Sequence, residues 1–202
     1  MERALAAAGF TVWPMIEHEA DDALGAAALV ADRDERVDQV LIVTADKDLG
    51  QCVRGNRVVQ FDRRKREIID ADGVRAKFGV GPESIPDYLG LVGDTADGFP
   101  GLPGWGAKSA SLVLARYGHI EDIPPAAGQW DVPGLRGAAK LSATLQAQLA
   151  DALLFRKIAT VDTDVDVGSV DDWKWTGPTD DFAAVADELG APDLVAYANR
   201  LG

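Results

Sequence analysis

The sequence has 202 residues, of which 47% are hydrophobic, and its formal net charge is −13 at pH 7. This length and apolar content predict a folded globular protein and exclude a disordered chain. No apolar stretch approaches the roughly 20 residues that cross a bilayer, so we expect no membrane association. The single cysteine, Cys52, cannot form an internal disulfide. We therefore expect a reducing, cytoplasmic location and a buried Cys52 side chain.

The net charge is distributed unevenly along the chain. Residues 160–202 contain 2 basic and 10 acidic side chains, whereas residues 47–116 contain 11 basic and 9 acidic side chains. An acidic tail is usually solvated surface. Phosphate binding needs lysine and arginine, so the middle of the chain stays compatible with a nucleic-acid partner.

The first half of the chain predicts a strand, helix, strand order. Residues 1–8 resemble the end of a helix, residues 11–16 a strand, and residues 20–32 an alanine-rich helix. Residues 40–44 form a continuous run of β-branched residues and leucine, typical of a strand buried on both faces. This order predicts a right-handed crossover and a parallel sheet, whose ligand sites lie beyond the carboxyl ends of the strands.

The second half is mainly helical. Two short apolar runs around the basic segment 63–66 predict a hairpin. A helical period begins near Gly73, and Pro82 is well placed to start a helix. After a glycine-rich interruption the helical pattern resumes, with one long amphipathic helix over residues 140–161 and one or two closing helices within residues 179–202.

Three clusters of carboxylates follow these elements. Each cluster has a structural explanation, because acids suit the first turn of a helix, aspartate is a good helix cap, and an isolated aspartate pair is usually surface. The third pair is spaced to share one side of a helical turn. The seven residues are Glu19, Asp21, Asp22, Asp46, Asp48, Asp94 and Asp97.

The combination favours a metal site. The first two clusters fall at the same edge of the predicted sheet, and the third could converge there from a following helix. Seven converging carboxylates would repel one another strongly without cations. Hard oxygen ligands suit Mg²⁺ or Mn²⁺, and two such ions about 4 Å apart stabilise the attacking and leaving oxygens of a phosphoryl displacement. The pattern therefore indicates phosphodiester hydrolysis.

The segment "GLPGWGAKSA", residues 101–110, indicates a phosphate contact of another kind. It lacks the spacing of a P-loop and of a dinucleotide-binding fingerprint. It could be a simple turn between helices. We favour a glycine hairpin in which Gly104 and Gly106 let the backbone approach a phosphate, with Lys108 adding a charge. Such contacts position a duplex without reading its bases. Trp105 could touch a sugar, but we favour packing between the helices.

Three segments resemble the signature blocks of the 5′ nuclease family. They are "EADDALG", "VTADKDLGQCV" and "YLGLVGDTADGFPGLPGWGAKSASLVLARYG". The family includes the 5′-3′ exonuclease domain of bacterial DNA polymerase I, stand-alone bacterial homologues and flap endonucleases. The resemblance runs from about residue 5 to about residue 160, and its third block is the most specific. It implies an α/β, PIN-like parallel-sheet nuclease core followed by a helical helix-three-turn-helix, DNA-binding element similar to a helix-hairpin-helix.

The resemblance also implies the site residues. All seven carboxylates would be catalytic and metal ligands for two divalent ions, Mg²⁺ or Mn²⁺. Carbonyl groups of the glycine hairpin would hold K⁺. The partner would be DNA with 5′ ends or flaps, bound by a monomer without an organic cofactor. The implied DNA-binding residues are Gly101, Gly104, Gly106, Lys108 and Ser109.

The resemblance departs from the family at the front of the chain. Family members begin with a strand that carries a metal-binding aspartate, followed by a basic arch, and neither is found here. We expect a partial nuclease core over residues 1–92, a DNA-binding region over residues 93–159, and an acidic segment over residues 160–202 that packs back on the core. One metal site would keep its ligands and the other would keep only part of its set, near Glu19.

The sequence thus predicts a structure-specific 5′-3′ exonuclease or flap endonuclease of DNA replication and repair, in which the missing front could impair activity. Two alternatives stay open. A non-catalytic module could bind duplex or flap DNA through the glycine hairpin. The other alternative is a PIN-type ribonuclease, although such small enzymes lack an appended duplex-binding element.

Overall fold

The computed structural model describes residues 1–200 and divides into two compact units. One unit joins residues 1–34 to the chain from residue 163 onward, and the other consists of residues 35–162. The segmentation at residues 92 and 159 that the sequence suggests stays a prediction.

The unit of residues 35–162 contains a three-stranded sheet. Its strands are β1 (Val40–Ile42), β2 (Val58–Asp62) and β3 (Glu67–Ile69), in that order across the sheet. Strand β1 runs parallel to β2, with Val40 opposite Val58, and β2 runs antiparallel to β3, with Gln60 opposite Ile69. The predicted hairpin is therefore confirmed, and a strand forms at Val40–Ile42. The expectation that this strand is buried on both faces is wrong, because Leu41 is 45% exposed, and the predicted parallel sheet is in fact mixed.

The turn between β2 and β3 is closed by a side chain. The Asp62 carboxylate accepts the backbone N–H groups of Arg64 and Lys65 at 2.9 and 3.1 Å. The bond from Lys65 is the main reason that the pKa of Asp62 lies below its usual value. Aspartate commonly closes turns in this way, so the basic segment is presented by a fixed hairpin.

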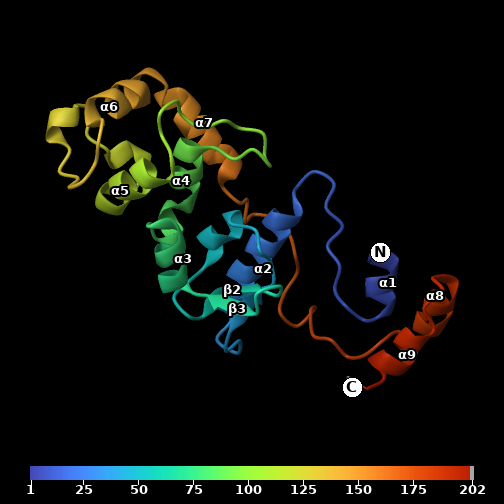
Figure 1. The fold of residues 1–202 in the computed structure, drawn as a ribbon. Coiled ribbons are helices and arrows are strands. Elements are labelled where there is room, and N and C mark those ends of the chain that lie inside the picture. Colours follow the sequence, from blue (N-terminus) through green and yellow to red (C-terminus); the bar gives the residue numbers. More distant parts are fainter. Residues whose placement is uncertain (201–202) are drawn as a thin grey trace. The chain divides into compact units, whose positions relative to one another are not determined.

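One 3-10 helix lies between β1 and β2, and the other helices of this unit follow β3. In chain order, the helices are η1 (Asp48–Cys52), α3 (Ala71–Phe78), η2 (Pro82–Ser84), α4 (Ile85–Val92), α5 (Ala107–Tyr117), η3 (Ile120–Asp122), η4 (Ala127–Gln129), α6 (Ala138–Ala147) and α7 (Leu149–Ala159). Helix α4 lies against α7 (Figure 1). Pro82 begins a 3-10 helix as the sequence predicts, and Cys52 is buried.

Helix α4 lies in the main apolar core of this unit. Its side chains Ile85, Leu89 and Leu91 are almost fully buried, and the cluster extends to residues of α5, α6 and α7. Gly90 allows the close approach of α7, because a Cβ there would lie 3.0 Å from the carbonyl oxygen of Ala152. This packing holds the end of α4 in place.

The predicted long helix over residues 140–161 is wrong in one respect. It is divided into α6 and α7 at Gln148, whose φ of −126° and ψ of 30° are not helical. The break separates two packing environments, because Leu145 is buried at the end of α6 while Ala152 of α7 is fully buried beside α4. The apolar periodicity of the sequence continues through this break and therefore did not reveal it.

The other unit contains four helices within the described residues. They are α1 (Glu2–Ala7), α2 (Ala20–Arg33), α8 (Phe182–Glu188) and α9 (Asp193–Ala198). Ala7 packs with Phe182 and Val185, and the alanine face of α2 packs with Val167. The predicted closing helices are confirmed, although the predicted range includes residues 201–202, which lie outside the described residues. Across residues 1–200, no helix is long and apolar enough to cross a membrane.

The predicted strand at residues 11–16 is wrong, because this segment is irregular. Pro14 has no N–H to donate to a ladder. Trp13 instead donates its Nε1–H to the carbonyl oxygen of Val167 at 3.0 Å and meets Trp173 edge to face at 5.5 Å. Side-chain packing, not strand pairing, holds this part of the chain.

A buried carboxylate joins α4, η3 and α7. Asp87, which is 2% exposed, accepts the N–H of Ile120 and a guanidinium N–H of Arg156 on Oδ1, both at 3.1 Å. Its Oδ2 lies 2.9 Å from Nδ1 of His119. The hydrogen bond to Asp87 raises the pKa of His119 above its usual value, against a smaller effect of burial.

This raised pKa predicts a pH-dependent contribution to stability. The stabilisation is complete below the unfolded pKa of His119, about 6.5, and is lost as the pH rises through the higher folded pKa. The difference in unfolding free energy between the wild type and His119→Gln should therefore be constant at low pH and shrink as the pH rises above about 6.5. Urea denaturation measures it, with His18→Gln as the control. A difference that is constant with pH would contradict the assignment.

Candidate functional site

The chain after β1 places two of the predicted aspartates. The backbone N–H of Asp46 donates to Thr44 Oγ1 at 3.1 Å, and the N–H of Asp48 donates to Asp46 Oδ1 at 3.2 Å. Gln60 of β2 donates its side-chain amide to the carbonyl oxygen of Asp46 at 2.6 Å. These bonds fix the loop, so that Asp48 begins η1 as a buried side chain while Asp46 is exposed.

The turn after α4 places two more. Gly93 ends α4 with a φ of +87°, a conformation that favours glycine. Asp94 and Phe99 then exchange two backbone hydrogen bonds of 2.9 and 3.0 Å. Asp94 and Asp97 therefore lie in a closed turn, and the expectation that they share a helical turn is wrong because Gly93 stops the helix before them.

Two glycine backbones hold this turn together. A Cβ at Gly101, where φ is +68°, would lie 2.4 Å from the nitrogen of Gly93. No side chain fits at so short a distance. Gly101 is buried, so its position gives it a packing role beside the aspartate turn, and its predicted contact with DNA stays a prediction.

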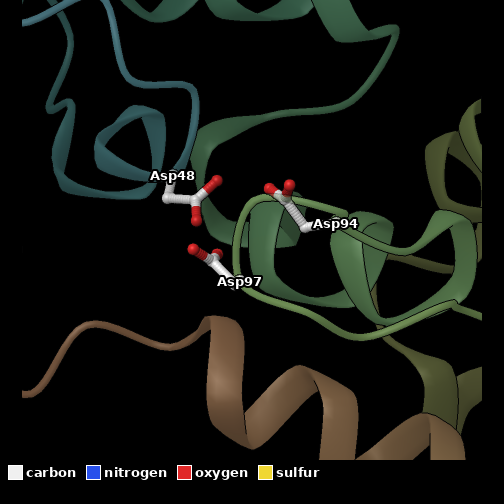
Figure 2. Close-up of side chains that lie close together, drawn as sticks. All are labelled: Asp48, Asp94 and Asp97. Atoms are coloured by element: carbon white, nitrogen blue, oxygen red, sulfur yellow. The ribbon is translucent and has the colours of Figure 1, made fainter.

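Three carboxylates from these two loops come together (Figure 2). Asp48, Asp94 and Asp97 each place one carboxylate oxygen within 4.8 Å of the others. Asp48 is 9% exposed and Asp94 is 5% exposed, whereas Asp97 is exposed. Two oxygens bound to one ion are at most about 4–5 Å apart, twice a typical metal–oxygen distance. The three oxygens therefore fit a single divalent ion.

The electrostatics of Asp48 support this fit. Its Oδ1 is buried and accepts no hydrogen bond, which is costly for a polar atom. Burial, a hydrogen bond to Asp97 and the charges of Asp46 and Asp97 raise the pKa of Asp48 to about 8, against the opposing charge of Lys47. A divalent cation would satisfy the buried oxygen and relieve the repulsion.

Lys47 lies next to these carboxylates, and sequence reasoning did not select it. Its ammonium group hydrogen-bonds to Asp94 Oδ2 and lies 3.9 Å from Asp48 Oδ1. Burial tends to raise the pKa of Asp94, but the bonds from Lys47 and from the N–H of Ala96 outweigh it and lower that pKa. Asp94 is therefore an anion paired with a lysine.

The first predicted cluster lies in the other unit, at the start of α2. The backbone N–H of Glu19 donates to Asp22 Oδ2 at 2.9 Å, which is the usual bond of a helix cap. Asp21 lies in the same first turn of α2. Capping accounts for the position of Asp22, and the assignment of Glu19, Asp21 and Asp22 as metal ligands stays a prediction.

The predicted glycine hairpin borders a cavity of about 670 Å³. Gly104, Gly106, Lys108 and Ser109 line it. The N–H of Gly106 donates to the Ser109 hydroxyl at 3.0 Å at the start of α5. Trp105 is 7% exposed and donates to the carbonyl oxygen of Leu141 at 3.3 Å, which confirms that it packs between helices.

A second glycine turn lines the same cavity and was missed from the sequence. Gly134 and Gly137, both with positive φ, flank Arg136, and Lys140 follows in the first turn of α6. The stretch "PGLRGAAK" repeats the order of glycine and lysine in "PGWGAK", and this local repeat could have revealed it. Within residues 1–200, no ion pair is found for Lys108, Arg136 or Lys140.

Comparison with known proteins agrees with this geometry. Residues 1–79 match the family model of the 5′-3′ exonuclease N-terminal resolvase-like domain, and residues 80–181 match that of the 5′-3′ exonuclease C-terminal SAM fold. The chain belongs to the 5′-3′ exonuclease family. The PIN-like nuclease fold with an appended helical domain, expected from the sequence, is therefore confirmed.

Curated members of the 5′-3′ exonuclease family are similar over most of this chain. DNA polymerase I of Pseudomonas aeruginosa is 38% identical over 150 residues, which are 74% of this chain and 16% of that protein. The 5′-3′ exonuclease of Aquifex aeolicus is 38% identical over 123 residues, which are 61% of this chain and 42% of that protein. This chain thus spans less than half the length of either relative.

Solved structures share the fold. The D15 flap endonuclease of bacteriophage T5, in a complex with DNA and metal ions, is 23% identical with a TM-score of 0.58, over 75% of this chain and 52% of that one. The catalytic core of Rad2 in complex with a DNA substrate is 19% identical with a TM-score of 0.53, over 94% of this chain and 63% of that one.

The contact between Gly93 and Gly101 predicts a specific loss of stability. Gly101→Ala should reduce the unfolding free energy by about 1–3 kcal/mol or more, because it combines backbone strain with a clash against backbone atoms. Gly104→Ala is the matched control, since its φ is also positive but a Cβ there meets nothing within 4 Å. Urea denaturation measures both variants. Equal losses would show that the backbones do not touch.

Proposed function

We propose that this chain is the metal-dependent nuclease region of a 5′-3′ exonuclease or flap endonuclease of DNA replication and repair. The observation that carries the proposal is the approach of one carboxylate oxygen each from Asp48, Asp94 and Asp97, together with a buried, unbonded Oδ1 on Asp48, in a member of the 5′-3′ exonuclease family. The substrate would be a phosphodiester near a 5′ end or flap.

Some residues of the chain would bind the metal ion, and others would orient the loop that carries its ligands. Asp48, Asp94 and Asp97 would hold one ion, Mg²⁺ or Mn²⁺, and the exposed Asp46 would orient the loop through its bond to the N–H of Asp48. Divalent ions, when bound, would supply electrostatic stabilisation of the attacking and leaving oxygens. Glu19, Asp21 and Asp22 are further candidate ligands from the sequence alone. The fixed loops keep these carboxylates in place before substrate arrives.

The cavity between the glycine turns would bind the duplex beside the cut. Lys108, together with the backbone N–H groups at the start of α5, would contact phosphates in a way that does not depend on sequence. The carbonyl groups of residues 101–106 would hold K⁺, as the resemblance implies. The chain would act as a monomer, in the cytoplasm and without an organic cofactor.

Cleavage of a labelled 5′-flap DNA in Mg²⁺ tests the proposal. Asp94→Asn and Asp97→Asn should lower the rate by about a hundredfold or more, since loss of a ligand costs at least as much as loss of an outer partner. Asp72→Asn, an exposed aspartate on α3, is the control. A version extended by the N-terminal strand and basic arch that the resemblance implies should cut faster than the chain alone.

Two results would contradict the nuclease assignment. If neither the chain nor the extended version cuts flap DNA, the chain is not the nuclease region proposed. If RNA displaces flap DNA and is itself cut faster, the PIN-type ribonuclease is the correct reading.

The cavity lined by Lys108, Arg136 and Lys140, called the basic cavity, supports a second and separable function, which is duplex binding without metal. Lys108→Glu should weaken binding to flap DNA in EDTA by about tenfold at about 0.1 M salt and flatten the salt dependence, because one phosphate contact is lost. Fluorescence anisotropy measures the affinity. Lys157→Glu, an exposed lysine on α7 outside the cavity, is the control, and equal losses in the two variants would exclude a specific contact.

A further inference from the structure

One lysine lies inside the acidic site. Lys47 separates Asp46 and Asp48 in the chain, and its ammonium group reaches the opposite loop to bond with Asp94 Oδ2. Its Nζ lies 3.9 Å from Asp48 Oδ1, the oxygen that accepts no hydrogen bond. The Lys47 side chain is 37% exposed, so it has room to leave toward solvent.

The negative charges around Lys47 explain why its ammonium group lies at this place. The carboxylates of Asp48 and Asp94 both lie within 4 Å of a single ammonium group, and like charges this close repel unless a cation lies between them. The Asp94 side chain is only 4% exposed, so water gives it little solvation. Lys47 thus performs part of the role of a cation for a buried anion.

We propose that Lys47 is a built-in counter-ion that a divalent metal ion must displace from Asp94. An oxygen that holds an ammonium group at hydrogen-bond distance cannot also bind a metal ion on that side, since the two cations would repel. Metal binding therefore breaks the Lys47–Asp94 pair and releases the lysine side chain. This inference rests on the proposed metal site. It adds that the Lys47 ammonium group competes with the metal ion for Asp94 and thereby lowers the metal affinity.

The alternative is that Lys47 stays bonded to Asp94 and assists metal binding. If Lys47 kept its bond to Asp94 in the metal-bound protein, it would position Asp94 and help to assemble the site. Removing the lysine would then weaken metal binding. Under displacement, removing it strengthens metal binding. The sign of the change separates the two arrangements.

Calorimetric titration with Mn²⁺ measures this sign without any cleavage. Lys47→Met keeps most of the apolar stem and removes the charge, and it should bind Mn²⁺ about tenfold or more tightly than the wild type. Lys157→Met, which removes a charge from an exposed lysine on α7 of the same unit, is the control and should stay within about twofold. Equal or weaker Mn²⁺ binding by Lys47→Met would overturn the inference.

Amine labelling of the wild type tests the displacement itself. Brief reaction with an amine-specific reagent, followed by mass spectrometry of the Lys47 peptide, should show faster modification when Mn²⁺ is present, with Lys157 unchanged. Slower or equal modification of Lys47 would overturn displacement even if the affinities shifted as expected. If the wild type shows no saturable Mn²⁺ binding, the proposed metal site falls as well. Saturable binding with no effect of Lys47 would leave the proposed function standing and remove only this inference.

Discussion

Repulsion between carboxylates at short range is the constraint on which the rest of the site depends. Asp48 and the turn that carries Asp94 and Asp97 bring three carboxylate oxygens within 4.8 Å of one another, two of them from side chains that are largely shielded from water. Such an arrangement forms only if the backbone around it is held firmly. Gln60 fixes the loop after β1, and the touching backbones of Gly93 and Gly101 fix the turn after α4. Lys47 lowers the electrostatic cost but leaves the Oδ1 of Asp48 unbonded.

Helix α4 links the acidic site to the rest of its unit. Its apolar side chains are buried in the core, Gly90 allows α7 to approach, and Asp87 joins it to η3 and α7. The chain leaves α4 through the aspartate turn and then continues directly into the glycine turn that borders the basic cavity. One continuous segment, residues 93–109, therefore carries two candidate metal ligands and the first set of candidate phosphate contacts. In a nuclease, this connection would set the register between the bound duplex and the bond that is cut.

Patterns of single residues predicted much of this arrangement. The run of β-branched residues predicted β1, the two apolar runs predicted the hairpin of β2 and β3, and the carboxyl end of β1 correctly indicated where Asp48 lies. The errors arose where tertiary contacts override local pattern. Residues 11–16 have a strand-like composition, but Pro14 and the packing of Trp13 prevent pairing; residues 140–161 keep a helical period through a break at Gln148. Lys47 was missed because a lysine between two aspartates resembles solvated surface until the fold brings Asp94 to it.

The location of a bound cation tests the central claim most directly. Crystals of the chain grown with Mn²⁺, with diffraction collected at the manganese edge, would reveal each bound ion by its anomalous signal. The account predicts a peak within about 2–3 Å of carboxylate oxygens of Asp48, Asp94 and Asp97, and loss of that peak in Asp94→Asn. A peak that avoids these three side chains, or no peak at a Mn²⁺ concentration that saturates binding in solution, would contradict it.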